Sequence, residues 1–334
     1  MHTIHNILLQ LADGRFHSGS ELAANLGFSR TTVWKQVQHL TQQYNIPVQA
    51  VQGRGYRLEE PLELLDTEKI LDALTPSVRG LVRKLQVVWS LDSTNRFLME
   101  GSQVEPESGT VVAAEHQRAG RGRRGREWIS PFGKNLYFSI LWHFKASPAT
   151  LSGLSLAVAV AIMRALAGMG ITGLGLKWPN DILWQRQKLC GVLLEMQGEA
   201  AGPCMVVTGV GLNVKMPVAE GHAITQPWTD LSHISPEPVS RNHLLAELLN
   251  QLLPAMQQYE ESGLQSFLPD WRRWDAMAGK QVQLLLPTRT ISGRVKGIDD
   301  QGNLLLEQDD SVEAFAAGEI SLKADSSDSH ATAD

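Results

Sequence analysis

The chain has few cysteines, and its first residues contain no long apolar run. Among its 334 residues there are two cysteines, Cys190 and Cys204, too few for a disulfide framework. No apolar run of signal-peptide type stands at the start of the chain, so we expect free thiols in a cytoplasmic protein. Residues 154–170 are apolar and rich in alanine, but Arg164 interrupts them. Their length is near the lower limit for a membrane span, and the stretch predicts a buried helix and no membrane attachment.

The usual motifs for metals and nucleotides are also missing. The ten histidines form no cluster with the spacing of a metal site, so no structural metal is expected. There is neither the GxxxxGK[ST] pattern of a P-loop nor a strand-embedded GxGxxG followed by an acidic residue. Any nucleotide site here must therefore use a different device. The chain is also too long for one compact core, and its length fits three domains.

Residues 118–126, RAGRGRRGR, are the most unusual segment of the chain, and we call them the arginine loop. Residues 118–134 contain six basic residues and one acidic residue, a net charge of +5 in a chain whose net charge is −5. The glycines at 120, 122 and 125 allow positive φ angles and close approach of the backbone to a ligand, while the arginines supply forked, permanently charged donors. The segment predicts a loop that folds around an anion. A solvated basic loop or a nucleic-acid patch would have the same composition.

Three predicted strands meet around the arginine loop. A strand that begins at residue 85 ends in the polar cluster DSTN, residues 92–95. Residues 110–117 predict a second strand that delivers Gln117 to the loop, and residues 135–144 predict a third that leaves it. Polar side chains and arginines should therefore gather at one place in the fold.

Further strands follow downstream. Pro179 restricts Trp178 to an extended conformation, so KWPND (177–181) predicts the end of a strand. A hairpin that turns at residues 185–187 then places Lys188 on its return strand. A lysine between a polar turn and an apolar strand is usually a surface residue that points to solvent.

The remaining chain predicts supporting structure. The strand of residues 206–214 contains the sequence GVG (209–211), and glycines inside a strand suggest a bulge or backbone pressed against a ligand. Residues 243–263 predict an amphipathic helix. From residue 280 onward the sequence alternates with glycine turns, as expected of a small β-barrel.

The amino-terminal segment has the pattern of a winged helix-turn-helix. Residues 21–40 predict two short helices joined by a tight turn at Gly27, and residues 48–58 predict a hairpin, the wing. Residues 1–58 carry five basic and two acidic residues, a positive excess that favours nucleic acid, although winged helices can also be pure protein-interaction modules. The side chains expected to meet DNA are those at the start of the second helix, capped by Ser29, and at the wing tip: Ser29, Arg30, Thr31, Thr32, Lys35, Gln36 and Arg54.

Five motifs of this chain resemble, in order and spacing, those of the biotin protein ligases. They are STN (93–95), QRAGRGRRGREW (117–128), KWPNDIL (177–183), KLCGVLLE (188–195) and GVGLNV (209–214). With the helix-turn-helix ahead of them, the chain is most similar to the bacterial bifunctional biotin ligases that also repress the biotin operon. The resemblance extends from residue 1 to about residue 323, and the motifs are specific as a set and weak singly.

The resemblance implies a fold and a division into domains. The expected fold class is a multidomain α+β protein with a winged helix-turn-helix, a mixed-sheet α/β core of the biotin/lipoate ligase type and a small SH3-like β-barrel. The DNA-binding domain would occupy residues 1–62, the biotin- and ATP-binding catalytic domain 63–275 and the barrel 276–323. The polar residues 324–334 are expected to be a disordered tail.

The resemblance also implies an activity. Members of the family use ATP with Mg²⁺ to convert biotin to biotinyl-5′-AMP, and then transfer biotin to one lysine of a biotin carboxyl carrier protein. The bifunctional members repress biotin synthesis genes by binding operator DNA, which for this chain implies a homodimer when biotinyl-AMP is bound. A cationic loop with Mg²⁺ suits the first step because it screens two anions that must meet.

The family's site residues transfer to this chain position by position. The catalytic set is Lys188, Arg123, Arg121 and Asp181. The contacts to biotin and the adenylate are Ser93, Thr94, Asn95, Gln117, Arg121, Gly122, Arg123 and Lys188. The ATP side is Asn180, Asn213 and Trp228, and for Trp228 a partly buried loop aromatic is nearly as good an interpretation.

Two other functions fit parts of the sequence. Lipoate ligases share much of this architecture and the same adenylate chemistry, although the arginine loop, KWPND and KLCG are of the biotin type. A repressor that senses biotin without catalysis could keep Arg121, Arg123 and Lys188 as binding residues only.

Overall fold

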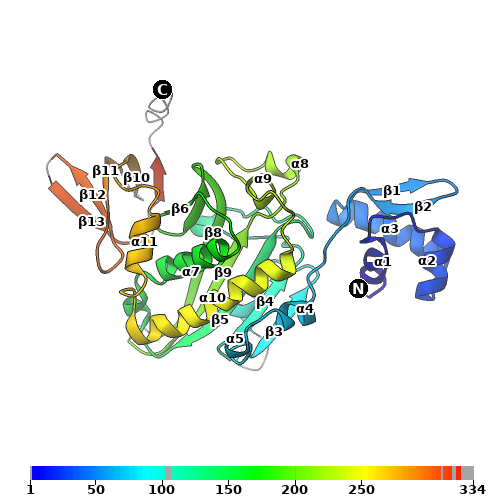
Figure 1. The fold of residues 1–334 in the computed structure, drawn as a ribbon, viewed down its shortest axis with the longest axis horizontal. Helices are drawn as coiled ribbons and strands as arrows, with labels where there is room; N and C mark the ends of the chain where they lie inside the picture. The colour runs from blue at the N-terminus through cyan, green and yellow to red at the C-terminus, as the bar shows by residue number, and fades with distance from the viewer. Residues whose placement is uncertain are drawn as a thin grey trace.

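Three regions follow one another along the long axis of the molecule (Figure 1). An amino-terminal helical region, a large central sheet covered by helices and a small carboxy-terminal sheet succeed each other in chain order. The computed structural model describes residues 2–101, 107–199, 201–286, 288–309, 311–317 and 321–324.

The amino-terminal region is a helix-turn-helix followed by a hairpin, as predicted. Ser18 caps the second helix in a capping box with Glu21, and Gly27 ends it with φ 69°. The Ser29 hydroxyl accepts a 3.0 Å hydrogen bond from the backbone N–H of Thr32, so the recognition helix begins where the sequence predicts. The elements are α1 (His2–Leu11), α2 (Gly19–Leu26), α3 (Arg30–Tyr44), β1 (Val48–Val51) and β2 (Gly55–Leu58).

The central region is built on a seven-stranded mixed sheet with the order β3-β4-β5-β9-β8-β7-β6. The pair β3–β4 is parallel and the other neighbours are antiparallel. The strands are β3 (Lys84–Val88), β4 (Thr110–Ala114), β5 (Leu136–Phe144), β6 (Leu174–Lys177), β7 (Asp181–Trp184), β8 (Gln187–Gly198) and β9 (Cys204–Leu212). The helices of this region are α4 (Thr67–Asp72), α5 (Pro76–Arg79), α6 (Thr94–Glu100), α7 (Leu154–Gly168), α8 (Val218–Gly221), α9 (Leu231–Ile234), α10 (Arg241–Ser262) and α11 (Leu268–Trp274), with 3₁₀ turns η1 (Arg123–Gly125) and η2 (Pro148–Leu151).

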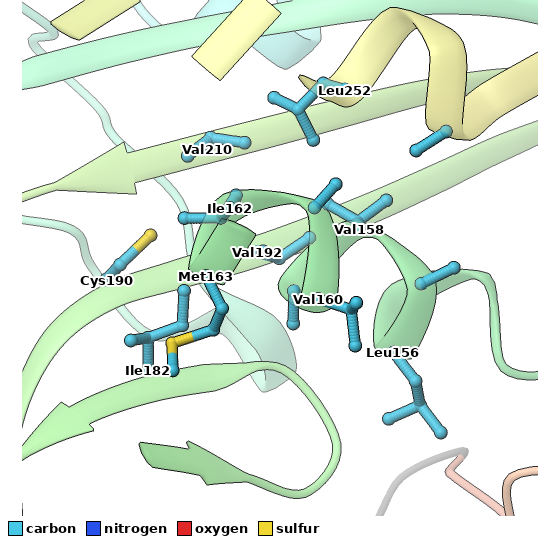
Figure 2. Close-up of a cluster of buried hydrophobic side chains, with 14 of the residues drawn as sticks. Leu156, Val158, Val160, Ile162, Met163, Ile182, Cys190, Val192, Val210 and Leu252 are labelled. Atoms are coloured by element: carbon cyan, nitrogen blue, oxygen red, sulfur yellow. The ribbon is translucent and has the colours of Figure 1, made fainter. Parts of the chain in front are cut away.

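Helices α7 and α10 cover one face of this sheet (Figure 1). The apolar stretch with Arg164 is the buried helix α7, as predicted, and Arg164 pairs with Asp270 at 2.8 Å. Figure 2 shows side chains of α7 gathered with Val192 of β8, Val210 of β9 and Leu252 of α10. Because neighbouring residues of a strand point to opposite faces, Gly191, Gly209 and Gly211 lie on the other side of the sheet. We call that side the glycine face.

The glycine face is covered differently from the helical face. Helix α6 packs there, where Leu98 joins Val112, Leu141 and Val207 in a small apolar cluster. Val112, Leu141 and Val207 alternate with residues of the main core, as expected for strands buried on both faces. Three neighbouring glycine positions on β8 and β9 leave room beside α6 for other groups.

A buried ion pair fixes the segment that leaves the winged helix. Glu115, just after β4, pairs at 2.8 Å with Arg241 at the start of α10, and both side chains are almost completely buried. The other carboxylate oxygen of Glu115 accepts a 2.5 Å hydrogen bond from the backbone N–H of Leu65. Arg241 also donates to the backbone carbonyls of Asn135 and Glu63. The segment around residues 63–65, which we call the linker, is therefore held against the central sheet. Its anchor Glu115 lies two residues before Gln117.

An aromatic cluster joins the winged helix to the central region. The ring of Tyr44, at the end of α3, makes edge-to-face contacts with Trp89, His116 and Phe132. His5 of α1 meets the ring of Trp89 at 5.1 Å between centroids. The first region is thus packed against the strand that leads into the arginine loop.

Acidification is expected to weaken this junction through His116. Burial lowers the pKa of its imidazole, and the charge of Arg118 lowers it further. The unfolded chain then takes up this proton at a higher pH than the folded chain does, so the stability that neutral His116 contributes is present above its ordinary pKa and lost as the pH falls. Melting curves at about pH 7.5 and about pH 5.5 should show a smaller acid destabilisation in His116→Gln than in the natural chain. An equal loss in both would contradict this role of His116.

The carboxy-terminal region is a five-stranded antiparallel sheet with the order β13-β12-β11-β10-β14. The indole N–H of Trp178 donates a 3.1 Å hydrogen bond to the carbonyl of Gly302, and Arg272 pairs with Asp300, so this sheet is attached to the central region. Residues 325–334 of the predicted tail lie outside the described residues. In the part of the chain that the structure describes, no helix is long and apolar enough to cross a membrane. The strands are β10 (Gln281–Leu285), β11 (Thr290–Ile298), β12 (Leu304–Gln308), β13 (Ser311–Phe315) and β14 (Ser321–Ala324).

Candidate functional site

A polar cavity of about 120 Å³ opens on the glycine face. We call it the first cavity. The arginine loop, the start of α6, the KWPND segment and strands β8 and β9 all contribute to its wall. The predicted site residues that line it are Ser93, Thr94, Asn95, Gln117, Arg121, Gly122, Arg123, Asn180, Asp181 and Lys188. Segments more than a hundred positions apart in sequence therefore meet at one site.

The glycines of β9 are needed because other side chains lie against them. A Cβ atom at Gly209 would stand 2.1 Å from the side-chain oxygen of Asn95, and one at Gly211 would stand 2.4 Å from the ring of Trp128. The pairing of β9 with both neighbours is regular through these positions, so a bulge, one of the two interpretations of these glycines, is absent. The groups that approach the backbone are Asn95 and Trp128 of the protein itself.

Buried hydrogen bonds fix the end of the first cavity at α6. The side-chain oxygen of Gln117 accepts from the backbone N–H of Thr94 at 2.9 Å, and the Gln117 amide donates to Ser130 at 3.1 Å. The Ser139 hydroxyl contacts Thr94 at 2.7 Å and the Asn95 oxygen at 2.6 Å. Because every one of these groups is partnered, and all but the half-buried Gln117 are buried, this end of the cavity is rigid.

The arginine loop is a tight turn that is pinned to the sheet. The N–H of Gly122 donates to the carbonyl of Arg126 at 2.7 Å. Of its three glycines only Gly125 has a positive φ, 69°, and the other positive φ belongs to Arg124, 59°. Gly120 and Gly122 therefore do not use the freedom to take positive φ angles that glycine allows. Gly120 is required instead for close packing, since a Cβ there would stand 2.5 Å from the carbonyl oxygen of Trp128.

Two arginines of the loop have definite partners. Arg121 contacts the carboxylate of Glu195 at 3.1 Å, and the same oxygen accepts from Asn95 at 2.9 Å. Arg123 donates to the side-chain oxygen of Asn180 at 3.2 Å and to the backbone carbonyl of Ala317, just after β13 of the carboxy-terminal region. Burial lowers the pKa of the Arg123 guanidinium, and the Asp181 carboxylate opposes that shift. Arg123 therefore connects the loop, the KWPND segment and the carboxy-terminal region.

Lys188 points into the cavity and not to solvent. Its ammonium lies 2.7 Å from Asp181, and both side chains are largely buried, 17% and 15% exposed. It also stands over the ring of Trp128, 5.4 Å from the centroid. The surface position that the local sequence favours is therefore wrong. A buried ammonium beside one carboxylate can receive a second, anionic partner.

A larger cavity of about 830 Å³ adjoins the first, and we call it the second cavity. Trp128, Lys188 and Gln226 line both. The remaining ATP-side candidates, Asn213 and Trp228, line only the second cavity. The Asn213 amide donates to the carbonyl of Thr229 at 3.0 Å, while its buried side-chain oxygen has no hydrogen-bond partner among the described residues.

The sequence interpretation missed three residues of this site, and it placed the candidate DNA-binding residues in a different region. Trp128 divides the two cavities, Glu195 holds Arg121, and Ser139 supports the α6 end. Trp128 and Glu195 do lie inside the motifs quoted above. The glycines at fixed spacing in those motifs are a sequence signal that a large side chain packs against them. The candidate DNA-binding residues of α3 and the wing line neither cavity.

Models of three known families match the chain in order. Residues 3–57 match an HTH domain, residues 87–213 the biotin/lipoate A/B protein ligase family, and residues 278–323 the biotin protein ligase C-terminal domain. The first match covers the helix-turn-helix and wing, the second most of the central sheet with nearly all of the first cavity and part of the second, and the third the small sheet.

Individual proteins are similar over nearly the whole chain. The chain is 40% identical to "Bifunctional ligase/repressor BirA" of Salmonella typhimurium over 94% of its length and 95% of that protein. It is 39% identical to the protein of the same name from Escherichia coli, over 95% and 96% of the two chains. A biotin protein ligase from Aquifex aeolicus, solved in complex with biotin and ATP, superposes with a TM-score of 0.63 at 28% identity, over 73% of this chain and all of that one. From its architecture, its cavities and these relatives, the chain belongs to the bifunctional ligase/repressor family of biotin protein ligases.

Proposed function

We propose that this chain is an ATP-dependent biotin protein ligase that also acts as a biotinyl-AMP-dependent repressor of biotin synthesis genes. The observation that carries the first part is the first cavity, where Lys188, Arg121 and Arg123 converge beside a rigid polar pocket. The second part follows from the winged helix-turn-helix and from the bifunctional relatives.

In the first half-reaction an oxygen of the biotin carboxylate attacks the α-phosphorus of ATP. The bond from that phosphorus to the bridging oxygen breaks, and pyrophosphate leaves with its electron pair, so biotinyl-5′-AMP forms. The carboxylate is already ionised near pH 7, so no general base is needed. The barrier is electrostatic because two anions approach each other, and fixed cations in a water-poor site lower it.

Each candidate residue has a role in this proposal. Lys188 neutralises the carboxylate and the α-phosphate, and Arg121 and Arg123 with the backbone at Gly122 enclose the adenylate. The neutral ureido ring of biotin suits the hydroxyl and amide groups at the α6 end, and the nucleotide extends into the second cavity toward Asn213 and Trp228. The biotin contacts are then Ser93, Thr94, Asn95 and Gln117.

Mg²⁺ would enter with ATP. This ion keeps several waters and takes one or two protein carboxylates beside the phosphates. Asp181 fits because it lines the first cavity with Asn180 as a neighbouring polar group. When bound, the ion supplies charge neutralisation of the phosphates.

In the second half-reaction the acceptor lysine of a biotin carboxyl carrier protein attacks the acyl carbon, and AMP leaves. The lysine must lose one proton, for which Asp181 is a candidate acceptor beside bulk solvent. A covalent thioester is not part of this proposal. Cys190 is buried on the helical face, and burial raises the pKa of its thiol, so it is a poor nucleophile.

Repression extends the same proposal. The adenylate acts as corepressor: enclosure of the ligand by the arginine loop orders a surface on which two subunits pair in the cytoplasm, and the dimer binds a two-fold operator. The bonds of Glu115 to Leu65 and Arg241, and the aromatic cluster at Tyr44, support a mechanical link between the pocket and the DNA-binding region. Biotin-dependent retention of operator DNA, together with a doubled mass in solution, would test this half.

Pyrophosphate release with Mg-ATP tests the enzyme. Three parallel reactions contain biotin, lipoate or no acid. Release that requires biotin is expected, and release with lipoate alone would assign the chain to lipoate-type acyl ligation. Tight biotin binding without pyrophosphate would leave a sensor without catalysis.

Glu195 is expected to slow the loss of the adenylate by holding Arg121. Glu195→Ala removes this anchor and one partner of Asn95. Because the pair is partly exposed, we expect release of biotinyl-AMP to be roughly threefold to fivefold faster. The release rate of Glu195→Gln, which keeps an acceptor oxygen, should lie between those of Glu195→Ala and the natural chain. Glu107→Ala, which breaks an exposed pair with Arg83 elsewhere, is the control. Equal release rates in Glu195→Ala and the natural chain would contradict the anchor.

A further inference from the structure

Trp34 is the exposed tryptophan of the recognition helix. Its side chain is 51% exposed, and it is the one tryptophan among the large apolar side chains exposed in the described part of the chain. Exposing so large a ring to water is unfavourable, and large exposed apolar groups often mark binding sites. Nothing among the described contacts of α3 covers it.

The helical spacing places Trp34 on the outward face of α3. Val33, Val37 and Leu40 of this helix are buried in the domain core. Residues spaced by three and four share a face, so Trp34 shares one with Thr31 and Gln38, and Lys35 follows Trp34 on the outward side of the helix. Of these, Thr31 and Lys35 are exposed like Trp34. The ring therefore belongs to the same surface as two candidate DNA contacts.

The charge of this surface indicates what binds there. Helix α3 carries Arg30 and Lys35 and has no acidic residue in its sequence RTTVWKQVQHLTQQY. On the wing, the guanidinium groups of Arg54 and Arg57 stack on the ring of Phe16 at 4.0 and 4.7 Å, which holds two more cations on this domain. A polyanion with an apolar group inside a groove fits a basic helix that carries one exposed indole.

We propose that Trp34 lies in the major groove of the operator and recognises thymine through its C5-methyl group. This inference rests on the proposed repressor function. In the major groove each T·A pair presents one methyl group among polar base edges, and apolar side chains distinguish thymine by contact with it. Trp34 is the fifth residue of α3, and in a helix-turn-helix the residues near the start of the recognition helix reach base edges. Trp34 is thus a specificity-determining residue, and Lys35 supplies phosphate attraction.

The test uses the full-length protein with biotin and Mg-ATP. A duplex is first selected from a random library by the natural chain. Each thymine of the selected duplex is then replaced by deoxyuridine, which removes only the methyl group, and Kd is measured at several salt concentrations. With the natural chain, we expect one position in each half-site to lose about fourfold in affinity, the effect of one buried methyl-sized group.

Variants separate this contact from other effects. Trp34→Ala should bind the selected duplex about tenfold or more weakly, lose sensitivity to the thymine methyl, and keep the salt slope and the biotinylation rate. Lys35→Ala should instead lose one phosphate contact, so the slope of log K against log salt concentration should fall by about 1. Its affinity should still depend on the thymine methyl group. Leu9→Ala is the matched control, because Leu9 is a 48% exposed apolar residue of the same domain on a different helix.

Three results would overturn the proposal. Full methyl sensitivity in Trp34→Ala would show that another residue reads thymine. Loss of dimerisation in Trp34→Ala with unchanged sensitivity would show that the ring binds protein. If the natural chain with biotin and Mg-ATP enriches no duplex, the repressor function fails, and the role of Trp34 fails with it.

Discussion

Replacing Lys188 by alanine is expected to lower the rate of biotin adenylation by about two to three orders of magnitude. That is the usual cost of removing one fixed charge or donor that stabilises developing charge in an enclosed site. The Lys188 ammonium is largely buried, 2.7 Å from Asp181, and its removal also leaves the Asp181 carboxylate without its cation. ATP–pyrophosphate exchange at saturating biotin measures the effect.

Lys215→Ala is the matched control for this experiment. Lys215 also contacts a carboxylate at 2.7 Å, that of Glu60, but it is exposed and lines neither cavity. The control should exchange pyrophosphate at the natural rate. Near-native exchange by Lys188→Ala would remove Lys188 from the catalytic set, and with it the assignment of the first cavity.

Gly209→Ala is expected to lower adenylation by about a hundredfold while the chain still folds. The added Cβ would stand 2.1 Å from the Asn95 oxygen, and Asn95 is buried with hydrogen bonds to Ser139, Leu193 and Glu195. Since Asn95 cannot move freely, the α6 end of the cavity must shift, and misplacement of about 1 Å near a reacting group can cost that much. Overpacking should also lower the free energy of unfolding by about 1–3 kcal/mol.

Gly168→Ala controls for the effect of any glycine replacement. Gly168 lies at the end of α7, and a Cβ there would meet nothing within 4 Å. A helical alanine in its place should change the free energy of unfolding by at most about 1 kcal/mol, in the stabilising direction, with full activity. If Gly209→Ala retained native activity, Asn95 and the α6 end of the cavity would not be part of the biotin site.

Local signals in the sequence predicted much of the fold. Ser29 caps the recognition helix because a short hydroxyl side chain can satisfy the first free N–H groups. The hairpin turn was placed correctly, and Gln185 and Arg186 take positive φ values there. The apolar stretch with Arg164 was correctly identified as a buried helix. Each of these predictions depends on residues that are close together in the sequence.

Contacts between distant segments could not be read in the same way. Local pattern placed Lys188 in solvent, whereas the fold brings Asp181 and Trp128 around it. Likewise, Gly209 signalled a special backbone, but only the fold shows that the reason is Asn95, more than a hundred positions away. The family resemblance supplied candidate residues for the site, and it did not indicate Glu195 as the partner of Arg121.

The two halves of the proposed function meet at the short segment just after strand β4. Gln117 holds Thr94 in the cavity, His116 touches Tyr44 of the recognition helix, and Glu115 binds the linker. These three consecutive residues contact the ligand pocket, the DNA-binding region and the segment between them. A shift of this short stretch on ligand binding would be felt in all three places.

The most direct test of the central claim is the intact mass of a biotin carboxyl carrier domain after incubation with this chain, biotin and Mg-ATP. The account predicts the addition of one biotinyl group, located on one lysine, and its loss with Lys188→Ala but not with Lys215→Ala. An unmodified carrier in the presence of the natural chain would contradict it, because the first cavity would then not be the active site of a ligase.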